Sequence, residues 1–324
     1  MILVKTPFRI SLVGGGTDLP AFYTRNGHGA VVSAAINKYM YIVIHPYFHD
    51  KLRVKYSRTE DVDSIEELKH PIVRECLRMM KLTSGLEIAS LADIPAGLGL
   101  GSSSSFTVCL LHALHAYQGR FIGKPALAEE ACHIEIDQLC EPIGKQDQYA
   151  ATFGGLNYIR FNADHSVDVE GLRIGHDITD ELMRRFLVFY IGRNRNASDI
   201  LREQQGAVGE EGKLMIARNL SELADRLREA IVEARLDSVG EILNDGWQLK
   251  KKLASKISDS EIDRIYETGL RAGATGGKLL GAGGGGFMLF YCEPDLQPRV
   301  REVLGLRELS VELEREGSKV VYAE

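Results

Sequence analysis

A loop rich in glycine and serine, residues 95–105, most constrains the fold of this chain, because a buried helix is predicted directly after it. The apolar positions that recur there at helical spacing are Phe106, Cys109, Leu110, Ala113, Leu114 and Tyr117. Glycine lets a backbone approach a ligand closely, and the free N–H groups and dipole of a helix N-terminus favour an anion. The loop is therefore predicted to bind phosphate. The alternative, a flexible surface turn, is disfavoured by the helix that follows.

Two common nucleotide-binding motifs are excluded by their spacing. No Gly-Lys-Ser/Thr ends the central loop, so it is not a Walker A motif. Residues 14–18 near the N-terminus read Gly-Gly-Gly-Thr-Asp, which lacks the Gly-x-Gly-x-x-Gly spacing of a Rossmann dinucleotide site. A phosphate-binding loop of another class is therefore expected.

Two further segments combine reactive side chains with turn residues. Residues 135–149 hold carboxylates and a lysine, so one carboxylate could deprotonate a hydroxyl and another could hold Mg²⁺. Composition alone favours a solvated helix end for this segment. Residues 276–286 include four consecutive glycines, whose entropic cost indicates close packing against a ligand or another backbone. A plain loop between strands is an equal alternative for them.

Short apolar and β-branched runs predict strands, and longer periodic runs predict helices. The expected strands are 8–13, 30–36, 39–45, 86–92, 156–161, 166–172, 186–191 and 287–291. Residues 30–45 are expected to form a hairpin around Asn37 and Lys38. The expected helices are 126–139, 211–234, 236–254 and 260–272.

Length and charge limit the class of protein. At roughly 100–200 residues per domain, the 324 residues predict two domains, which we divide as 1–180 and 181–324. The net charge of −6 disfavours nucleic acid as a partner, because binding it needs a basic surface. The five cysteines include no Cys-x-x-Cys pair and indicate a reducing compartment. Since no apolar run is long enough to span a bilayer, we expect a cytoplasmic protein with no membrane partner.

In this order, the segments resemble those of the GHMP kinase superfamily, which includes galactokinase, homoserine kinase and mevalonate kinase. The central loop is similar to that family's Pro-x3-Gly-Leu-Gly-Ser-Ser signature. Residues 6–18 are similar to its N-terminal motif, and residues 276–286 to its glycine-rich C-terminal motif. The resemblance implies a two-domain α+β fold. The N-terminal domain would resemble ribosomal protein S5 domain 2, the C-terminal domain would be ferredoxin-like, and the active site would lie between them.

Within the superfamily, residues 7–20 most resemble the D-glycero-D-manno-heptose 7-phosphate kinases. Those enzymes phosphorylate the anomeric hydroxyl to give the 1,7-bisphosphate, a step toward nucleotide-activated heptose for surface polysaccharide. Fucokinases carry tryptophan where this chain has Gly16, so a fucokinase is the second hypothesis. A non-catalytic sugar- or nucleotide-binding regulator is the third, and the presence of Asp147, Glu135 and Ser103 argues against it.

The resemblance also assigns residue roles, with ATP and Mg²⁺ as the implied cofactors. Asp147 matches the catalytic aspartate, and Arg9 matches an arginine that keeps this carboxylate ionised. Glu135 and Ser103 match the Mg²⁺ ligands. Asp18 matches the aspartate that holds sugar hydroxyls, with Gly16 and Thr17 beside it. The residues implied to bind the nucleotide phosphates are Pro95, Gly97, Gly99, Gly101, Ser102, Ser103 and Ser104.

The substrate's own phosphate needs cations in a net-negative protein. Arg193 and Arg195 follow a predicted buried strand, and a Gly-x-x-Arg stretch in heptose kinases favours Arg195. Lys145 is a second candidate cation, and solvated surface arginines are an almost equal alternative. The C-terminal motif adds two candidate substrate-binding residues, Gly283 and Gly284. The expected partners are ATP and a sugar phosphate. The oligomeric state is left open, with a homodimer as one candidate.

Overall fold

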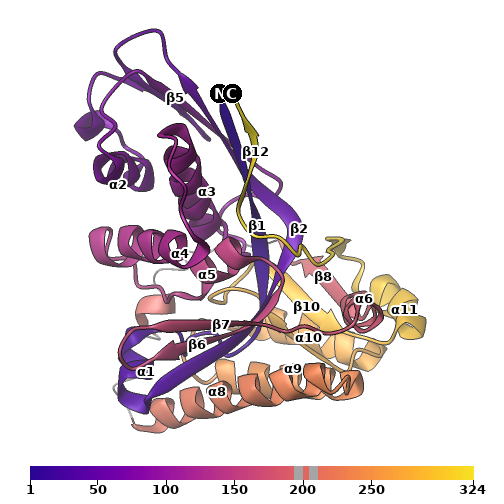
Figure 1. Ribbon diagram of the computed structural model, residues 1–324. Coiled ribbons are helices and arrows are strands. Elements are labelled where there is room, and N and C mark those ends of the chain that lie inside the picture. The colour runs from indigo at the N-terminus through magenta and orange to yellow at the C-terminus, as the bar shows by residue number, and fades with distance from the viewer. Residues whose placement is uncertain (193–199, 204–210) are drawn as a thin grey trace.

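Two β-sheets organise the chain in the computed structural model, which describes residues 1–192, 200–203 and 211–324 (Figure 1). The larger sheet has the strand order β12-β1-β2-β5-β3-β4, and the hairpin β6–β7 pairs onto β2. Its strands are β1 (Ile2–Val13), β2 (His28–Pro46), β3 (Leu52–Lys55), β4 (Thr59–Val62), β5 (Leu86–Ala92), β6 (Leu156–Asn162), β7 (Val167–Gly171) and β12 (Lys319–Ala323). The strands predicted at 86–92 and the hairpin at 156–172 are therefore confirmed.

The smaller sheet has the order β11-β8-β10-β9, and each neighbouring pair is antiparallel. Its strands are β8 (Phe186–Tyr190), β9 (Gly276–Leu279), β10 (Phe287–Tyr291) and β11 (Arg307–Glu308). In chain order, helices lie between β8 and β9 and again between β10 and β11. This β-α-β-β-α-β succession is the ferredoxin-like arrangement, which the family resemblance implies for the C-terminal domain.

Helices cover one side of the larger sheet, and Figure 1 shows α2 to α5 gathered there. They are α2 (Pro71–Met80), α3 (Ser102–Tyr117), α4 (Lys124–Cys132) and α5 (Gln146–Phe153), with α1 (Pro20–Asn26) before β2 and the short η1 (Ile65–Glu67) before α2. The apolar face of α3 packs on β1 and β2. The main core lies between these elements, because both the strands and α3 bury their apolar side chains there.

The second half is mostly helical between its first two strands. Its helices are α6 (His176–Arg184), α8 (Glu211–Val232), η3 (Leu236–Ser238), α9 (Val239–Lys250), α10 (Ser260–Ala272), η4 (Pro294–Leu296) and α11 (Gln297–Leu304). The side chain of Asp259 caps α10 by accepting hydrogen bonds from the N–H groups of Glu261 and Ile262. α9 packs on β9, and α8 packs on α9 and on β2. A second core forms around Trp247 and Phe290.

The hairpin predicted around Asn37 and Lys38 is wrong, because β2 runs through these residues as one strand. The register against β1 shifts at this point: Pro7 pairs with Tyr39, and the next residue of β1 pairs with Ile36. The two intervening residues form a β-bulge, which bends a strand without reversing it. The N–H of Asn37 donates to a carbonyl in the segment before β12, at 3.0 Å. Tertiary pairing thus replaces the turn that the residue types favour.

The last strand of the chain belongs to the first sheet. β12 pairs with β1, and Leu313 forms a bridge with Ile36 of β2. The boundary predicted between residues 180 and 181 falls inside α6. Residues near the C-terminus therefore complete the N-terminal domain, although they lie within the range assigned to the second.

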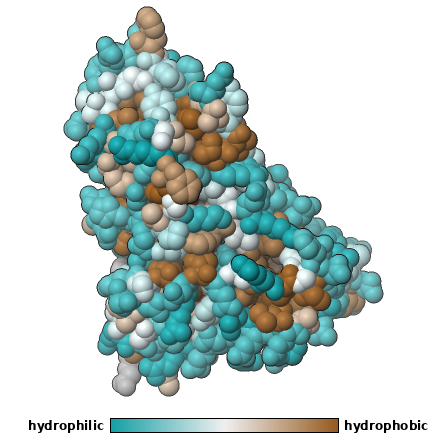
Figure 2. Space-filling model, in the orientation of Figure 1, coloured by the Kyte–Doolittle hydropathy of each residue, from teal (hydrophilic) through white to brown (hydrophobic). Residues whose placement is uncertain are grey.

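Polar side chains cover most of the face shown in Figure 2, where apolar groups gather in separate patches. Across residues 1–192, 200–203 and 211–324, no helix combines the length and the apolar character that crossing a bilayer requires.

Candidate active site

A cleft of about 330 Å³ brings the three predicted segments together. Most of its lining comes from the N-terminal domain, while Leu201, Lys250, Gly281 and Ala282 come from the second half. The predicted site residues that line it are Arg9, Gly16, Asp18, Gly97, Gly99, Gly101, Ser102, Ser103, Ser104, Glu135 and Asp147. The site therefore lies between the two domains, as the sequence resemblance implies.

The glycines of the central loop have backbone conformations that other residues rarely adopt. Gly97, Gly99 and Gly101 have φ angles of 83°, 84° and 75°, and α3 begins directly after the last of them. A Cβ atom on Gly99 would lie 2.6 Å from the carbonyl oxygen of Leu280. A Cβ on Gly281 would lie 2.4 Å from the Cα of Gly99. The expected close packing of residues 276–286 is thus confirmed, and its partner is the backbone of the central loop.

Arg9 and Asp147 form a two-pronged ion pair inside the cleft. Nε and Nη2 of Arg9 donate to the two carboxylate oxygens of Asp147 at 2.7 and 2.6 Å. The third guanidinium nitrogen, Nη1, donates to the carbonyl of Gly99 at 2.8 Å. Arg9 is 3% exposed, so its position is fixed by β1 and by these three bonds. The pair orients the carboxylate beside the glycine-rich loop.

Glu135 is a buried carboxylate held by two neutral donors. The Oγ of Ser103 donates to one carboxylate oxygen at 2.7 Å, and the side-chain amide of Gln148 donates to the other at 2.7 Å. Burial raises the pKa of Glu135 to about 7, although these hydrogen bonds act to lower it. The predicted helix 126–139 ends early as α4, and η2 (His133–Gln138), a π-helical turn, carries Glu135. Such turns are frequent at functional sites.

The donor set around Glu135 fits a magnesium ion. Mg²⁺ prefers hard oxygen ligands and is commonly held by one or two protein groups together with phosphates and water. Ser103 and Glu135 supply a hydroxyl and a carboxylate oxygen 2.7 Å apart. In the described ranges, no group of three histidine, cysteine or acidic residues could hold a metal by itself. The chemistry therefore fits an ion shared with nucleotide phosphates.

Asp18 closes the other side of the cleft. Its carboxylate accepts hydrogen bonds from the N–H of Gly16 at 2.9 Å and of Gln146 at 3.3 Å. A Cβ on Gly144 would lie 2.0 Å from this carboxylate, so only glycine fits there without displacement. Burial raises the pKa of Asp18, the charge of Asp147 raises it further, and the two N–H donors lower it. The arrangement places a buried carboxylate in the wall of the cleft.

Other predicted residues lie outside this lining. Thr17 is buried, and its hydroxyl exchanges hydrogen bonds with the backbone of Ala30. Pro95 lines a separate hollow beside β8 and β10. Lys145 lines another hollow and donates to the carbonyl of His165 at 3.0 Å.

The remaining predictions concern the C-terminal motif and the two arginines. Gly283 packs its backbone against Ile257, and the N–H of Gly284 donates to the Ile257 carbonyl at 3.0 Å. Neither glycine lines the cleft. Arg193 and Arg195 lie outside the described residues. The roles assigned to all these residues stay predictions.

Sequence reasoning missed Lys250, which lines the cleft and is 7% exposed. A signal was available, because Lys250 follows Leu243 and Trp247 at helical spacing on the buried face of α9. A lysine at a position where the helical pattern predicts an apolar residue indicates that its ammonium group has a polar partner.

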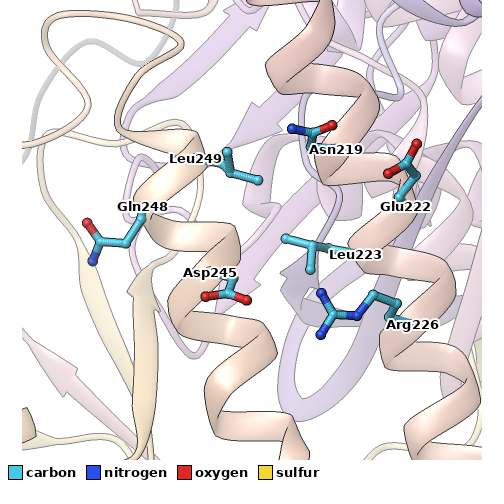
Figure 3. Close-up of a pocket in the computed structure, with 7 residues that line it drawn as sticks. All are labelled: Asn219, Glu222, Leu223, Arg226, Asp245, Gln248 and Leu249. Atoms are coloured by element: carbon cyan, nitrogen blue, oxygen red, sulfur yellow. The ribbon is translucent and has the colours of Figure 1, made fainter.

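A second hollow, of about 480 Å³, lies between α8 and α9 (Figure 3). Figure 3 shows Arg226 extending from α8 toward α9. Its lining residues are Asn219, Glu222, Leu223, Arg226, Asp245, Gln248 and Leu249. None of these seven belongs to the cleft or to the predicted site, so the chemistry is assigned to the cleft.

Comparison with known families assigns both halves of the chain. The model described as GHMP kinases N terminal domain matches residues 69–155, and the model described as GHMP kinases C terminal matches residues 227–308. The chain belongs to the GHMP kinases. The first match includes the central loop, Glu135 and Asp147. This GHMP kinase is thus an ATP-dependent phosphotransferase, as its resemblance implies, and the regulator hypothesis loses its support.

Relatives of this GHMP kinase include several sugar kinases. It is 30% identical to a D-glycero-alpha-D-manno-heptose 7-phosphate kinase of Campylobacter jejuni over 90% of each chain. It is 26% identical to a bifunctional fucokinase/GDP-fucose pyrophosphorylase of Arabidopsis thaliana over 90% of this chain and 30% of that protein. A crystal structure of a D-glycero-D-manno-heptose 1-phosphate kinase from Bacteroides thetaiotaomicron superimposes with a TM-score of 0.81 at 25% identity, over the full length of both chains.

Proposed function

We propose that this GHMP kinase uses ATP to phosphorylate the anomeric hydroxyl of D-glycero-D-manno-heptose 7-phosphate, giving the 1,7-bisphosphate. The observation that carries the proposal is the Asp147 carboxylate, held by Arg9 in one cleft with Glu135 and Ser103. The choice of sugar is supported by the 30% identity to the Campylobacter jejuni enzyme. The product would supply nucleotide-activated heptose for surface polysaccharide.

In the proposed reaction, Asp147 accepts the proton of the anomeric hydroxyl. The hydroxyl oxygen forms a bond to the γ-phosphorus of ATP, the bond from that phosphorus to the bridging oxygen breaks, and ADP leaves with the electron pair. Arg9 orients this carboxylate in the cleft through two hydrogen bonds. An anomeric hydroxyl is more acidic than an ordinary alcohol, so a carboxylate paired with arginine is a sufficient base. Because the transition state of phosphoryl transfer is loose, alignment and charge supply most of the acceleration.

The nucleotide would lie along the glycine-rich loop. Gly97, Gly99 and Gly101 have positive φ angles and carry no side chains. The N–H groups of the loop can therefore approach phosphate oxygens. Ser103 and Glu135 would hold Mg²⁺, which when bound neutralises part of the phosphate charge. The buried Glu135 is kept in place for this role by Gln148.

A fucokinase is the second candidate, favoured by the similarity to the Arabidopsis thaliana protein. The residue that separates the two candidates is Gly16, where fucokinases carry tryptophan. Gly16 lines the cleft with a φ of 100°, in the region that favours glycine. The missing side chain leaves room beside Asp18 for a larger, phosphorylated sugar.

The proposed function is tested by ATP turnover over a panel of acceptors: heptose 7-phosphate, unphosphorylated heptose, fucose, galactose and mevalonate. We expect the highest kcat/KM for heptose 7-phosphate, with one phosphate added at the anomeric carbon as seen by ³¹P NMR. Preferred turnover of fucose would establish the second candidate. A preference for any other acceptor would overturn the assignment of the sugar.

A prediction for the metal follows from Glu135. Glu135→Gln keeps the shape of the side chain but removes its charge. The Mg²⁺ concentration needed for half activity should therefore rise by at least about tenfold, the lower end of the affinity losses seen when residues of metal sites are changed. Glu130→Gln is the matched control, because Glu130 lies on the preceding turn and bonds to His115 rather than to the cleft. An unchanged Mg²⁺ titration in a folded Glu135→Gln variant would remove Glu135 from the metal site.

A further inference from the structure

Lys250 stands at the end of α9 with its ammonium group in the cleft. Its Nζ donates a hydrogen bond to the carbonyl of Gly281. Within the described residues, no ion pair includes Lys250, whereas the neighbouring Lys251 pairs with Asp263 at 3.1 Å. A buried ammonium without a carboxylate partner is costly, so an anion that enters the cleft would relieve this cost.

Among the described residues that line the cleft, the cations are Arg9 and Lys250, and each bonds to one partner of a single backbone contact. Arg9 donates to the carbonyl of Gly99, Lys250 donates to the carbonyl of Gly281, and these two glycines touch. Arg9 is already committed to Asp147 through two hydrogen bonds. Of the lining cations that the structure describes, Lys250 is therefore the one that forms no ion pair.

Charged groups from several elements face Lys250. Burial lowers the pKa of Lys250 to about 8, Arg9 of β1 lowers it further, and Asp18 and Asp147 raise it. Lys278 of β9 also faces it, since the charge of Lys250 is among the causes that lower the pKa of Lys278. Lys250 thus lies within the electrostatic reach of both the proposed base and the proposed sugar-binding carboxylate.

We propose that Lys250 donates a hydrogen bond to the phosphoryl group while it passes from ATP to the sugar hydroxyl. This inference rests on the proposed kinase reaction. The glycine-rich loop and Asp147 define the two ends of the transfer, and Lys250 reaches the cleft at the contact between Gly99 and Gly281. Lys250 keeps its protons throughout: Asp147 receives the hydroxyl proton, and ADP leaves with the electron pair. The C-terminal domain in this way supplies charge to a reaction whose base and metal ligands come from the N-terminal domain.

The test compares Lys250→Met with Lys251→Met on the same helix. Lys250→Met should lower kcat by roughly 10²–10³-fold, as expected when one donor to transition-state charge is removed. Its affinity for Mg-ATP, measured by calorimetry, should change by only a few-fold. Lys251→Met should keep its turnover, because Lys251 pairs with Asp263 outside the cleft.

The pH profile separates a chemical role from a structural one. If the charged lysine is required, kcat/KM of the wild type should fall as the pH rises through about 8, the pKa of Lys250. Lys250→Arg should restore part of kcat and remove this alkaline limb, because arginine stays protonated in that range. A purely structural lysine would affect the unfolding temperature and leave the limb in place.

Three outcomes would overturn the inference. The first is an unchanged kcat in Lys250→Met, and the second is an alkaline limb that persists in Lys250→Arg. The third is a loss confined to the KM of heptose 7-phosphate with unphosphorylated heptose unaffected, which would assign Lys250 to the substrate's own phosphate. Failure of the proposed function is a separate result, because the wild type itself would then show no turnover of heptose 7-phosphate.

Discussion

Asp147→Asn should lower turnover by roughly 10²–10⁴-fold, the usual contribution of general base catalysis. Asparagine has nearly the same shape and can still accept a hydrogen bond from Arg9, but it cannot take the hydroxyl proton. Nucleotide binding should stay nearly intact, because Asp147 is not among the residues proposed to bind the nucleotide phosphates. Steady-state turnover and Mg-ATP affinity, measured on the same preparation, check both parts of this expectation.

The matched control is Asp61→Asn. Asp61 forms a comparable pair with Arg53, whose Nε and Nη2 both donate to it, but on the surface of β3 and β4. This variant should retain full turnover and lose little stability, because exposed ion pairs contribute roughly 0–1 kcal/mol. Near-normal turnover of a folded Asp147→Asn variant would exclude Asp147 as the base.

Gly99→Ala should disrupt the site through the backbone alone. The added Cβ would lie 2.6 Å from the carbonyl oxygen of Leu280, so the two glycine-rich loops must separate. A displacement of about 1 Å in a reacting group can lower the rate by roughly 100-fold, and we expect a loss of that size in kcat/KM. Thermal unfolding measured beside the kinetics shows how much of the loss comes from destabilisation.

Gly27→Ala controls for the conformational part of this effect. Gly27 has a φ of 89°, close to the 84° of Gly99, but a Cβ there would meet nothing within 4 Å. Gly27→Ala should lose roughly 1–2 kcal/mol of stability, the strain of a left-handed backbone in a residue with a side chain, and Gly99→Ala should lose more because of its added clash. Only Gly99→Ala should also lose activity. Equal activity in the two variants would show that the contact between the loops does not position the site.

The sequence predicts the parts of the molecule whose cause is local. The glycines at 97–101 need unusual φ angles, and the helix after them shows its period plainly, so loop and helix could be placed together. Arg9 and Asp147 are 138 positions apart, so no local pattern connects them. Only the family resemblance predicts that they pair. Periodicity cannot show which distant side chains meet.

The errors and omissions have nonlocal causes. Asn37 and Lys38 have the composition of a turn, yet pairing with β1 and with the segment before β12 keeps them in one strand. Lys250 reads as an ordinary polar residue near a helix end until the fold buries it. β12 has no local feature that assigns it to the first sheet; its pairing with β1 and its contact with α3 are both nonlocal.

The chain passes between the two sheets twice, through residues 172–185 after β7 and through residues 309–318 before β12. A body attached at two points rotates freely only about the line that joins them, so any hinge motion between the domains has a fixed axis. α8 restricts even this rotation, because it packs against β1 and β2 while it belongs to the second domain. Exchange of substrates and products should therefore depend on local movements around the cleft and not on domain closure.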